Sequence, residues 1–372
     1  MIYTDTWLQD FSDYNNINNI NESGHQEITI FKPLATKKIR LRLNNLYDDV
    51  PLKFTKLVIH REGRKSIDVH VDGKYTFELA PHSAKWTDWI DIDIKANDYL
   101  TIDIHSPNKT IHSLGSNLSE SFTKIKNFTD RNDGFFFGVS AVQAQVEKKP
   151  IKIAFFGDSL TNQGFFSAPL SKELTYINRI VTANYGISGN RLLHPGSGKS
   201  QWVQSFGPAG VDRFDEMLND FQPDIVIFME GVNDLLHPGA GSPIDELPTS
   251  QELIDGINKL NQKCSLNNIV FVPMTVTPFR GNINNGIYAW NPKKEVIRQE
   301  FNKYIVRSFP YAVDLAPFVS DASQTRLAYE FDSGDHIHTS KCGGRKIAQF
   351  IERNLIDKGL VEVIKANRQI TE

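Results

Sequence analysis

The stretch IKIAFFGDSLT, residues 151–161, decides the fold that this sequence predicts. Residues 151–156 form a largely apolar run with the length of a buried strand, and Gly157, Asp158 and Ser159 follow it directly. Further apolar runs of strand length occur later in the chain, at residues 179–185, 225–229 and 269–272. Runs of this length, bounded by turn residues, are typical of the parallel strands of an α/β sheet.

Helical periodicity occupies the intervals between these runs. Leu253, Ile257 and Leu260 share one helical face. Two further faces are formed by Val296, Ile297, Tyr304 and Ile305, and by Ile347, Phe350, Ile351 and Leu355. Strands that alternate with helices predict a three-layer α/β/α domain of flavodoxin-like architecture around a parallel sheet.

The hydrophobic pattern before residue 147 has a period of two instead. Apolar and polar residues alternate at residues 39–44, 90–95 and 100–105, and shorter alternations occur at 57–59 and 69–71. Such alternation places one strand face in a core and the other in water, and turn signals such as Asp72-Gly73 separate the runs. We therefore expect an all-β sandwich of the jelly-roll kind over residues 1–147, followed by the α/β domain over residues 148–372.

Composition excludes several classes of protein. The 372 residues are 40% hydrophobic and 23% charged with a formal net charge of −3, so neither a nucleic-acid-binding protein nor a disordered chain is indicated. Two cysteines cannot form a disulfide framework or a four-cysteine zinc site. The first residues, MIYTDTWLQDFSDYNN, show no signal peptide and no apolar stretch is long enough for a membrane helix, so a cytoplasmic protein is expected. A homo-oligomer is left open.

In open parallel sheets, ligands bind beyond the carboxyl ends of the strands, so the segments that follow the apolar runs are candidates for chemistry. The first is the turn at Ser159. A serine on a sharp strand-to-helix turn is exposed and has its own N–H beside it, which suits a nucleophile whose attack creates an oxyanion. Helix capping by Asp158 or Ser159 explains the same residues equally well.

Two further segments offer hydrogen-bond donors. Gly189 lies in NYGISGN, residues 184–190, where glycine lets the backbone approach a ligand and direct an N–H toward it. Asn233 lies in EGVND, residues 230–234, and its amide is a neutral donor suited to an oxyanion. The alternative interpretation of either segment is an ordinary tight turn.

The fourth segment is DHIH, residues 335–338. Asp335 and His338 are spaced so that a carboxylate can orient an imidazole and stabilise its protonated form. A solvated loop is one alternative, and a metal site formed by Asp335, His336 and His338 is another, although no paired histidine or cysteine spacing supplies further ligands. Together the four segments provide a nucleophile, two donors and a base with its partner, which is the inventory of an acyl-transfer site.

These blocks resemble the SGNH (GDSL) hydrolase superfamily. The matching residues are GDSLT (157–161), NYGISGN (184–190), GVND (231–234) and DHIH (335–338), and the resemblance extends over about residues 150–355. Additional stretches resemble the XynE-like extracellular esterases, which also carry a strand-rich N-terminal region: ISGNRLL (187–193), RFDEML (213–218), MEGVNDL (229–235), TPFRG (277–281) and YEFDSGDHIH (329–338). One departure is Thr339, which stands where the family usually has proline.

The resemblance implies a Ser159–His338–Asp335 triad and an oxyanion hole formed by Ser159, Gly189 and Asn233, with no metal or cofactor. The predicted activity is a serine esterase acting on short-chain acyl esters, with acetyl groups on carbohydrate favoured over other substrates. No apolar lid follows any motif, so an interfacial lipase is disfavoured. The side chains expected to contact a small or oligosaccharide ester are Asp158, Asn190, Arg191, Trp202 and Glu230.

Two alternatives to that activity remain. The first is a general carboxylesterase, lipase-like enzyme or thioesterase acting on small esters. The second is a carbohydrate-binding protein that uses the sandwich, for which the candidate residues are His60, His70, Trp86 and Trp89. Packing in the core or on the strand surface explains these four residues more simply.

Overall fold

The computed structural model describes all residues except 16, 18–23, 33, 62, 129–133, 199, 361 and 363–372. The chain divides into two compact units. The first unit contains residues 1–150 together with 171–184, and the second contains residues 151–170 together with 185–372. The sequence boundary between residues 147 and 148 stays a prediction.

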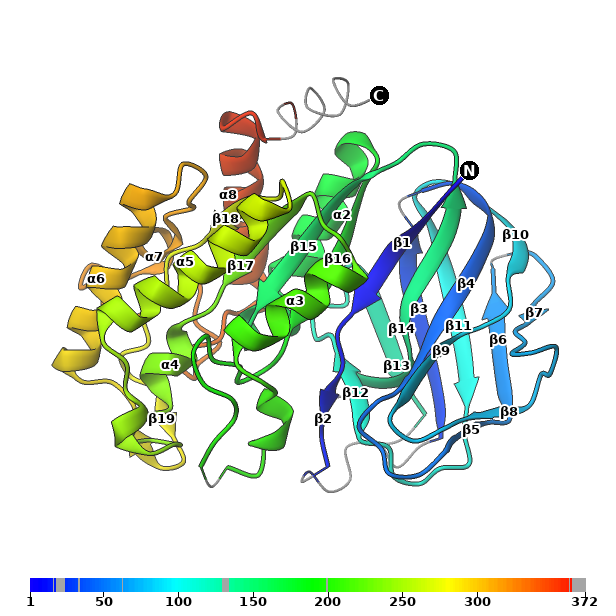
Figure 1. The fold of residues 1–372 in the computed structure, drawn as a ribbon, viewed down its shortest axis with the longest axis horizontal. Helices are drawn as coiled ribbons and strands as arrows, with labels where there is room; N and C mark the ends of the chain where they lie inside the picture. Colours follow the sequence, from blue (N-terminus) through cyan, green and yellow to red (C-terminus); the bar gives the residue numbers. More distant parts are fainter. Residues whose placement is uncertain are drawn as a thin grey trace. The chain divides into compact units, whose positions relative to one another are not determined.

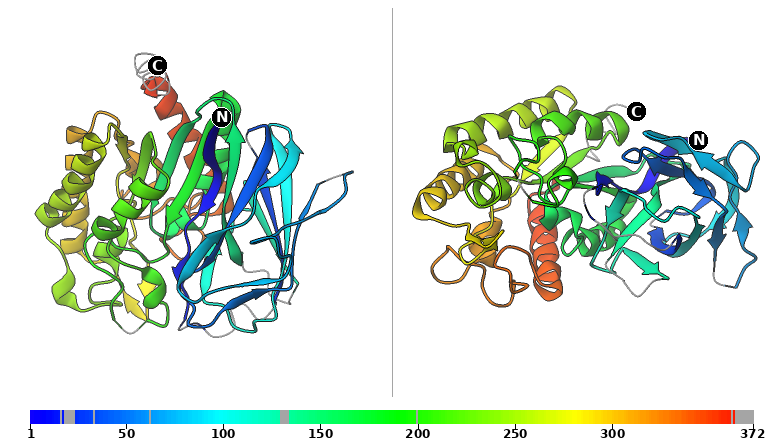
Figure 2. Two further views of the ribbon diagram at one scale, coloured as in Figure 1. Left: turned by 45° about the vertical axis from the view of Figure 1, so that its right-hand side comes forward. Right: turned by 90° about the horizontal axis from the view of Figure 1, so that it is seen from below.

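The first unit consists mainly of antiparallel strands in two sheets (Figures 1 and 2). One sheet has the order β10–β4–β14–β1, with β9 beside β4, β12 beside β14 and β2 beside β12, and the middle of β16 pairs in parallel with β1. The other has the order β13–β3–β11–β6–β7, and β5 pairs with β8. The bounds are β1 Ile2–Gln9, β2 Ser12–Asp13, β3 His25–Lys32, β4 Thr36–Asn45, β5 Leu52–Phe54, β6 Lys56–His60, β7 Ile67–Asp68, β8 Phe77–Leu79, β9 Ser83–Trp86, β10 Ile90–Ile94, β11 Asp98–His105, β12 Ser113–Ser116, β13 Thr123–Asn127, β14 Phe135–Val146 and β16 Ile180–Gly186.

The alternating pattern accounts for how these two sheets pack. Leu41 and Leu43 on β4 are fully buried, whereas Arg40 between the buried positions is half-exposed. Trp7 on β1 donates a hydrogen bond from Nε1 to Thr123 Oγ1 on β13 at 2.7 Å, which links the two sheets. Gly138 on β14 has a φ of +83°, and a Cβ there would lie 3.2 Å from the Phe54 ring.

The second unit contains parallel strands covered by helices. Strand β17 (Ile225–Met229) pairs in parallel with β15 (Ile151–Gly157) and with β18 (Val270–Pro273). Helices α3 and α5 cover one face of these strands and α8 covers the other (Figures 1 and 2). The helix bounds are α1 Ser159–Asn162, α2 Ser167–Asn178, α3 Gly210–Asp220, α4 Val232–Leu236, α5 Ser250–Leu266, α6 Pro292–Ser308, α7 Leu315–Val319 and α8 Lys341–Asp357. A short hairpin joins β19 (Ile283–Asn284) to β20 (Ile287–Tyr288).

The predicted fold class is confirmed: an α/β domain with parallel strands follows a strand-rich region. One predicted helix face is wrong in detail, because Val296 on α6 is 53% exposed. The buried apolar face of α6 is formed by Ile297, Phe301 and Ile305, which are spaced four residues apart. None of the helices in the described ranges has the length and apolar character needed to cross a membrane.

Candidate active site

Ser159 is the first residue of α1, immediately after the turn that ends β15. Asp158 is the N-cap of α1, and its Oδ1 accepts a hydrogen bond from the Leu160 N–H at 2.9 Å. The turn requires glycine at position 157, because a Cβ there would lie 2.2 Å from Thr161 Oγ1 and 2.6 Å from Met229 O. Asp158 therefore caps the helix, and the Ser159 side chain is not needed for capping. The two interpretations of this turn are compatible.

The structure brings Ser159, His338 and Asp335 into one hydrogen-bonded series. His338 Nε2 lies 2.8 Å from Ser159 Oγ, and His338 Nδ1 lies 2.5 Å from Asp335 Oδ2. With the proton on Nδ1, the ring donates to the carboxylate and leaves Nε2 free to accept the serine proton. This is the arrangement that a nucleophile, a base and an orienting carboxylate require.

Asp335 is held as a carboxylate by its neighbours. Burial would raise its pKa, but the side chain of His338 and the backbone N–H groups of His338 and Ile337 outweigh burial and hold the pKa well below its usual value. The two N–H groups donate to Oδ1 at 2.8 and 3.1 Å. Asp335 therefore remains ionised at neutral pH and keeps the His338 ring in position.

His336 is directed to a different partner. Its Nδ1 lies 2.6 Å from Asp332 Oδ2, and its backbone N–H donates to Asp332 Oδ1 at 3.0 Å. Its φ is +66°, so the chain turns between two neighbouring histidines that pair with separate carboxylates. A metal site would need the side chains of Asp335, His336 and His338 to point at one position. They do not, because the two histidines face different carboxylates.

The two expected oxyanion donors, Gly189 and Asn233, lie in tight turns that contain a glycine with positive φ. Gly189 has a φ of +78°, and a Cβ at this position would lie 2.0 Å from Cδ1 of Phe206. Asn233 follows Gly231, whose φ is +114°, and its Nδ2 donates to Asn190 O at 2.9 Å. Within the described residues no second acceptor is found for this amide, which leaves one of its two N–H groups available to a ligand.

Arg213 on α3 connects the ends of three strands beneath this region. Its guanidinium donates to Asn190 Oδ1 at 2.7 Å, to Tyr185 O at 2.8 Å, to Gly157 O at 2.9 Å and to Glu230 Oε1 at 2.8 Å. These partners belong to the three segments that carry Ser159, Gly189 and Asn233. Sequence reasoning assigned Arg213 no role, although it begins the quoted stretch RFDEML.

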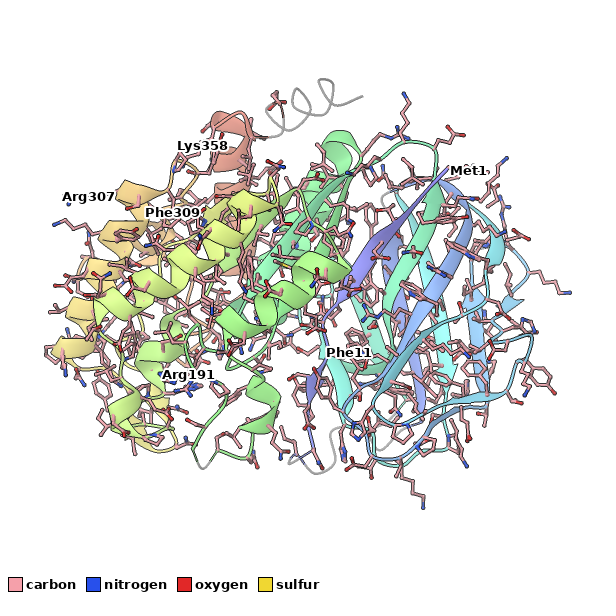
Figure 3. All side chains as sticks on the ribbon, in the orientation of Figure 1. Met1, Phe11, Arg191, Arg307, Phe309 and Lys358 are labelled. Atoms are coloured by element: carbon pink, nitrogen blue, oxygen red, sulfur yellow. The ribbon has the colours of Figure 1, made fainter. Side chains whose placement is uncertain are left out.

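Four of the five side chains expected to contact a substrate are buried. Asp158, Asn190, Arg191 and Glu230 are at most 2% exposed, and a contact of any of them with a substrate stays a prediction. Asn190 donates to Phe206 O and Pro208 O, and Arg191 (labelled in Figure 3) donates to Glu246 Oε2 at 2.6 Å. Asp158 Oδ2 and Glu230 Oε2, in contrast, are buried without a hydrogen-bond partner among the described residues. Buried loops need such partners for their backbone groups, which is why polar side chains occur there. Trp202 is half-exposed and stays a prediction.

Two buried carboxyl groups next to these loops have altered acidity. Burial raises the pKa of Glu230 to about 7 even though Arg213 opposes the shift. Burial also raises the pKa of Asp234, whose carboxylate accepts the backbone N–H groups of Leu192 and Leu193 at 2.7 and 2.9 Å. Asp234 thus fixes the loop that follows Asn190, a role that sequence reasoning missed.

A protein-family model described as GDSL-like lipase/acylhydrolase matches residues 153–351, more than half of the chain. No significant match is found among curated proteins. Similar solved structures include a GDSL-like lipase from Bacteroides thetaiotaomicron (17% identity, 57% of this chain and 92% of that chain, TM-score 0.42). An acetyl xylan esterase (19% identity, 55% and 98%, TM-score 0.38) and a mutant acetyl-xylooligosaccharide esterase from Geobacillus (17% identity, 55% and 94%, TM-score 0.41) are also similar. These structural likenesses are too distant to bear on substrate.

Proposed function

The chain belongs to the GDSL-like lipase/acylhydrolase family, and from this premise we propose that it is a serine esterase that removes short acyl groups, acetyl above all, from carbohydrate. The observation that carries the proposal is the series Ser159 Oγ, His338 Nε2, His338 Nδ1 and Asp335 Oδ2, with contacts of 2.8 and 2.5 Å. A structural role for these residues does not require a serine hydroxyl to face an imidazole that a carboxylate orients.

In the proposed reaction, His338 Nε2 accepts the Ser159 proton as Oγ attacks the ester carbonyl carbon. The carbonyl oxygen becomes an oxyanion, which the N–H groups of Ser159 and Gly189 and the Asn233 amide stabilise. The carbon–oxygen bond to the alcohol then breaks, and His338 returns the proton to the departing alcohol oxygen. Water attacks the acyl-enzyme with His338 again as base, releasing the acid and restoring Ser159.

The preference for a short acyl group rests on the surroundings of Gly189. The Phe206 ring packs directly on this residue, closer than a Cβ would permit. If the Gly189 N–H holds the oxyanion, the ring lies beside the bound carbonyl and limits the length of its acyl chain.

A panel of p-nitrophenyl esters of increasing chain length, assayed beside acetylated sugars, tests both levels of the proposal. We expect the highest kcat/KM for acetyl esters and release of acetate from the sugars, with no turnover by the Ser159→Ala variant. A preference for chains beyond about eight carbons would overturn the acetyl assignment and retain the esterase.

The carbohydrate-binding alternative predicts a different outcome from the same protein. Trp86 and Trp89 already pack on the guanidinium of Arg40, at 4.6 and 4.7 Å from the ring centres. These contacts occupy ring surface that a sugar would use. Binding of sugars without hydrolysis of any ester would favour that alternative over the esterase.

A further inference from the structure

A second cluster of ionisable side chains lies in the first unit, on the face of β3 and β11 opposite their buried isoleucines. His25 on β3 is paired directly with His105 on β11, and Asp103 is two residues before His105, on the same face of the strand. One side-chain atom from each of His25, Asp103 and His105 lies within 4.8 Å of the others. We propose that these three residues bind a divalent transition-metal ion of the zinc class, independently of the esterase site.

The distances suit such an ion. His25 Nε2 lies 2.9 Å and His105 Nε2 lies 3.2 Å from the same carboxylate oxygen, Asp103 Oδ1. In a tetrahedral site with metal–ligand distances of about 2.0–2.1 Å, neighbouring ligand atoms are separated by about 3.3 Å. Because the two rings are stacked with an angle of 21° between their planes, the rings must tilt apart for both Nε2 atoms to face one ion, and solvent supplies the remaining ligand. Two imidazoles and one carboxylate are a common donor set for zinc and for neighbouring divalent metals.

The histidine rings are held in place before any ion arrives. The His25 ring stacks on His105 with centres 3.8 Å apart and on Phe128 with centres 3.7 Å apart. His105 Nε2 is buried, and its contact with Asp103 lacks hydrogen-bond geometry, so this atom has no hydrogen-bond partner among the described residues. A metal ion between the three groups would satisfy that nitrogen. Ligands fixed on adjacent strands lose little conformational freedom on binding.

The cations that surround Asp103 leave the proposed position open. Lys56 Nζ lies 2.5 Å from Oδ2, and His60 Nε2 lies 3.6 Å from Oδ2, so both contact the oxygen that the metal does not use. Burial would raise the pKa of Asp103, but hydrogen bonds from Lys56 and His25 lower it to about 2, which keeps the carboxylate ionised as a ligand. Lys56 then acts as a hydrogen-bond partner of a ligating carboxylate, a common supporting contact at metal sites.

Titration of the full chain with Zn²⁺ against a chromogenic chelator tests the proposal. We expect one strong site in the wild type, and His25→Gln and His105→Gln should each weaken it by about tenfold or more. His82→Gln is the matched control. His82 Nε2 also lies 3.0 Å from a carboxylate oxygen, Asp49 Oδ1, but this pair is outside the proposed metal site. This control should bind Zn²⁺ as the wild type does.

The double variant His25→Gln/His105→Gln separates this site from other histidines, including His336 and His338. Its esterase activity and circular dichroism should equal those of the wild type, which reports folding independently of metal binding. Loss of the strong site in this variant supports the proposal, as does a Zn²⁺-dependent rise in the wild-type melting temperature that the variant lacks. Equal Zn²⁺ affinity and stoichiometry in wild type and double variant, or no strong site in the wild type, would overturn it.

Discussion

Replacing Arg213 with methionine should destabilise the second unit severely, although the methionine side chain still fills most of the space of the arginine stem. Methionine retains much of the apolar volume of the arginine stem and removes the guanidinium. The Arg213 and Glu230 side chains are 4% and 0% exposed, and their contact of 2.8 Å is lost in the variant. The carbonyl oxygens of Gly157 and Tyr185 lose a donor as well.

The magnitude follows from this burial. Removing one partner of a buried ion pair costs about 3–5 kcal/mol, because the remaining carboxyl group must either stay charged in a medium that cannot solvate it or take up a proton. Each buried acceptor left without a donor adds about 1–3 kcal/mol unless water reaches it. We therefore expect the free energy of unfolding to fall by at least about 3–5 kcal/mol.

Urea unfolding followed by circular dichroism at 222 nm measures the change through the helices, most of which belong to the second unit. Lys263→Met is the control, because Lys263 on α5 pairs with Asp215 on α3, the helix that carries Arg213, at 2.7 Å, and these two side chains are 22% and 57% exposed. A surface pair of this kind contributes about 0–1 kcal/mol.

A second variant tests the reason for the loss. Adding Glu230→Gln to Arg213→Met removes the uncompensated carboxylate, so at pH 8 the double variant should be more stable than Arg213→Met alone. If Arg213→Met loses no more stability than Lys263→Met, or if Glu230→Gln brings no recovery, the account of Arg213 is refuted.

Three further predictions concern single residues. Asn233→Ala should lower kcat by about 10²–10³ while circular dichroism stays unchanged, because one oxyanion donor is lost; a wild-type kcat would exclude that role. Glu230→Gln should gain stability relative to the wild type as the pH rises from about 5 to 8. The raised pKa of about 7 means that the stability contributed by neutral Glu230 is present below its unfolded pKa of about 4.3 and lost as pH rises through 7, so parallel urea curves at pH 5 and 8 would contradict the shift. Gly189→Ala should cost about 1–2 kcal/mol from its backbone conformation and displace the Phe206 ring, lowering both melting temperature and activity; unchanged values would refute the required turn.

The strands of the α/β domain and the segments of its site could be located from sequence because their signals are local. An apolar run followed by a turn determines where Ser159 lies, whatever packs around it. His338 and Asp335 are three residues apart, so their pairing also depends on one short loop. Only the approach of His338 to Ser159, 179 residues away, needed the tertiary fold or the family resemblance.

The contacts of Arg213 could not be predicted in this way. Its partners lie 17 to 56 residues away in the sequence, and an arginine on an amphipathic helix normally faces solvent. The same limitation explains why the burial of Asp158, Asn190, Arg191 and Glu230 was not foreseen, since a polar residue in a loop indicates neither burial nor exposure by itself. Residues 171–184 carry a helix and a strand that read as part of the α/β domain, yet they cluster with the first unit.

Labelling of the intact protein with a fluorophosphonate, followed by mass spectrometry of its peptides, tests directly whether Ser159 is the nucleophile of the proposed esterase. We expect one adduct, on the peptide that contains Ser159, with labelling abolished in Ser159→Ala and strongly slowed in His338→Ala. Absence of any adduct on Ser159 in active wild-type protein, or hydrolysis of p-nitrophenyl acetate by Ser159→Ala at the wild-type rate, would contradict it.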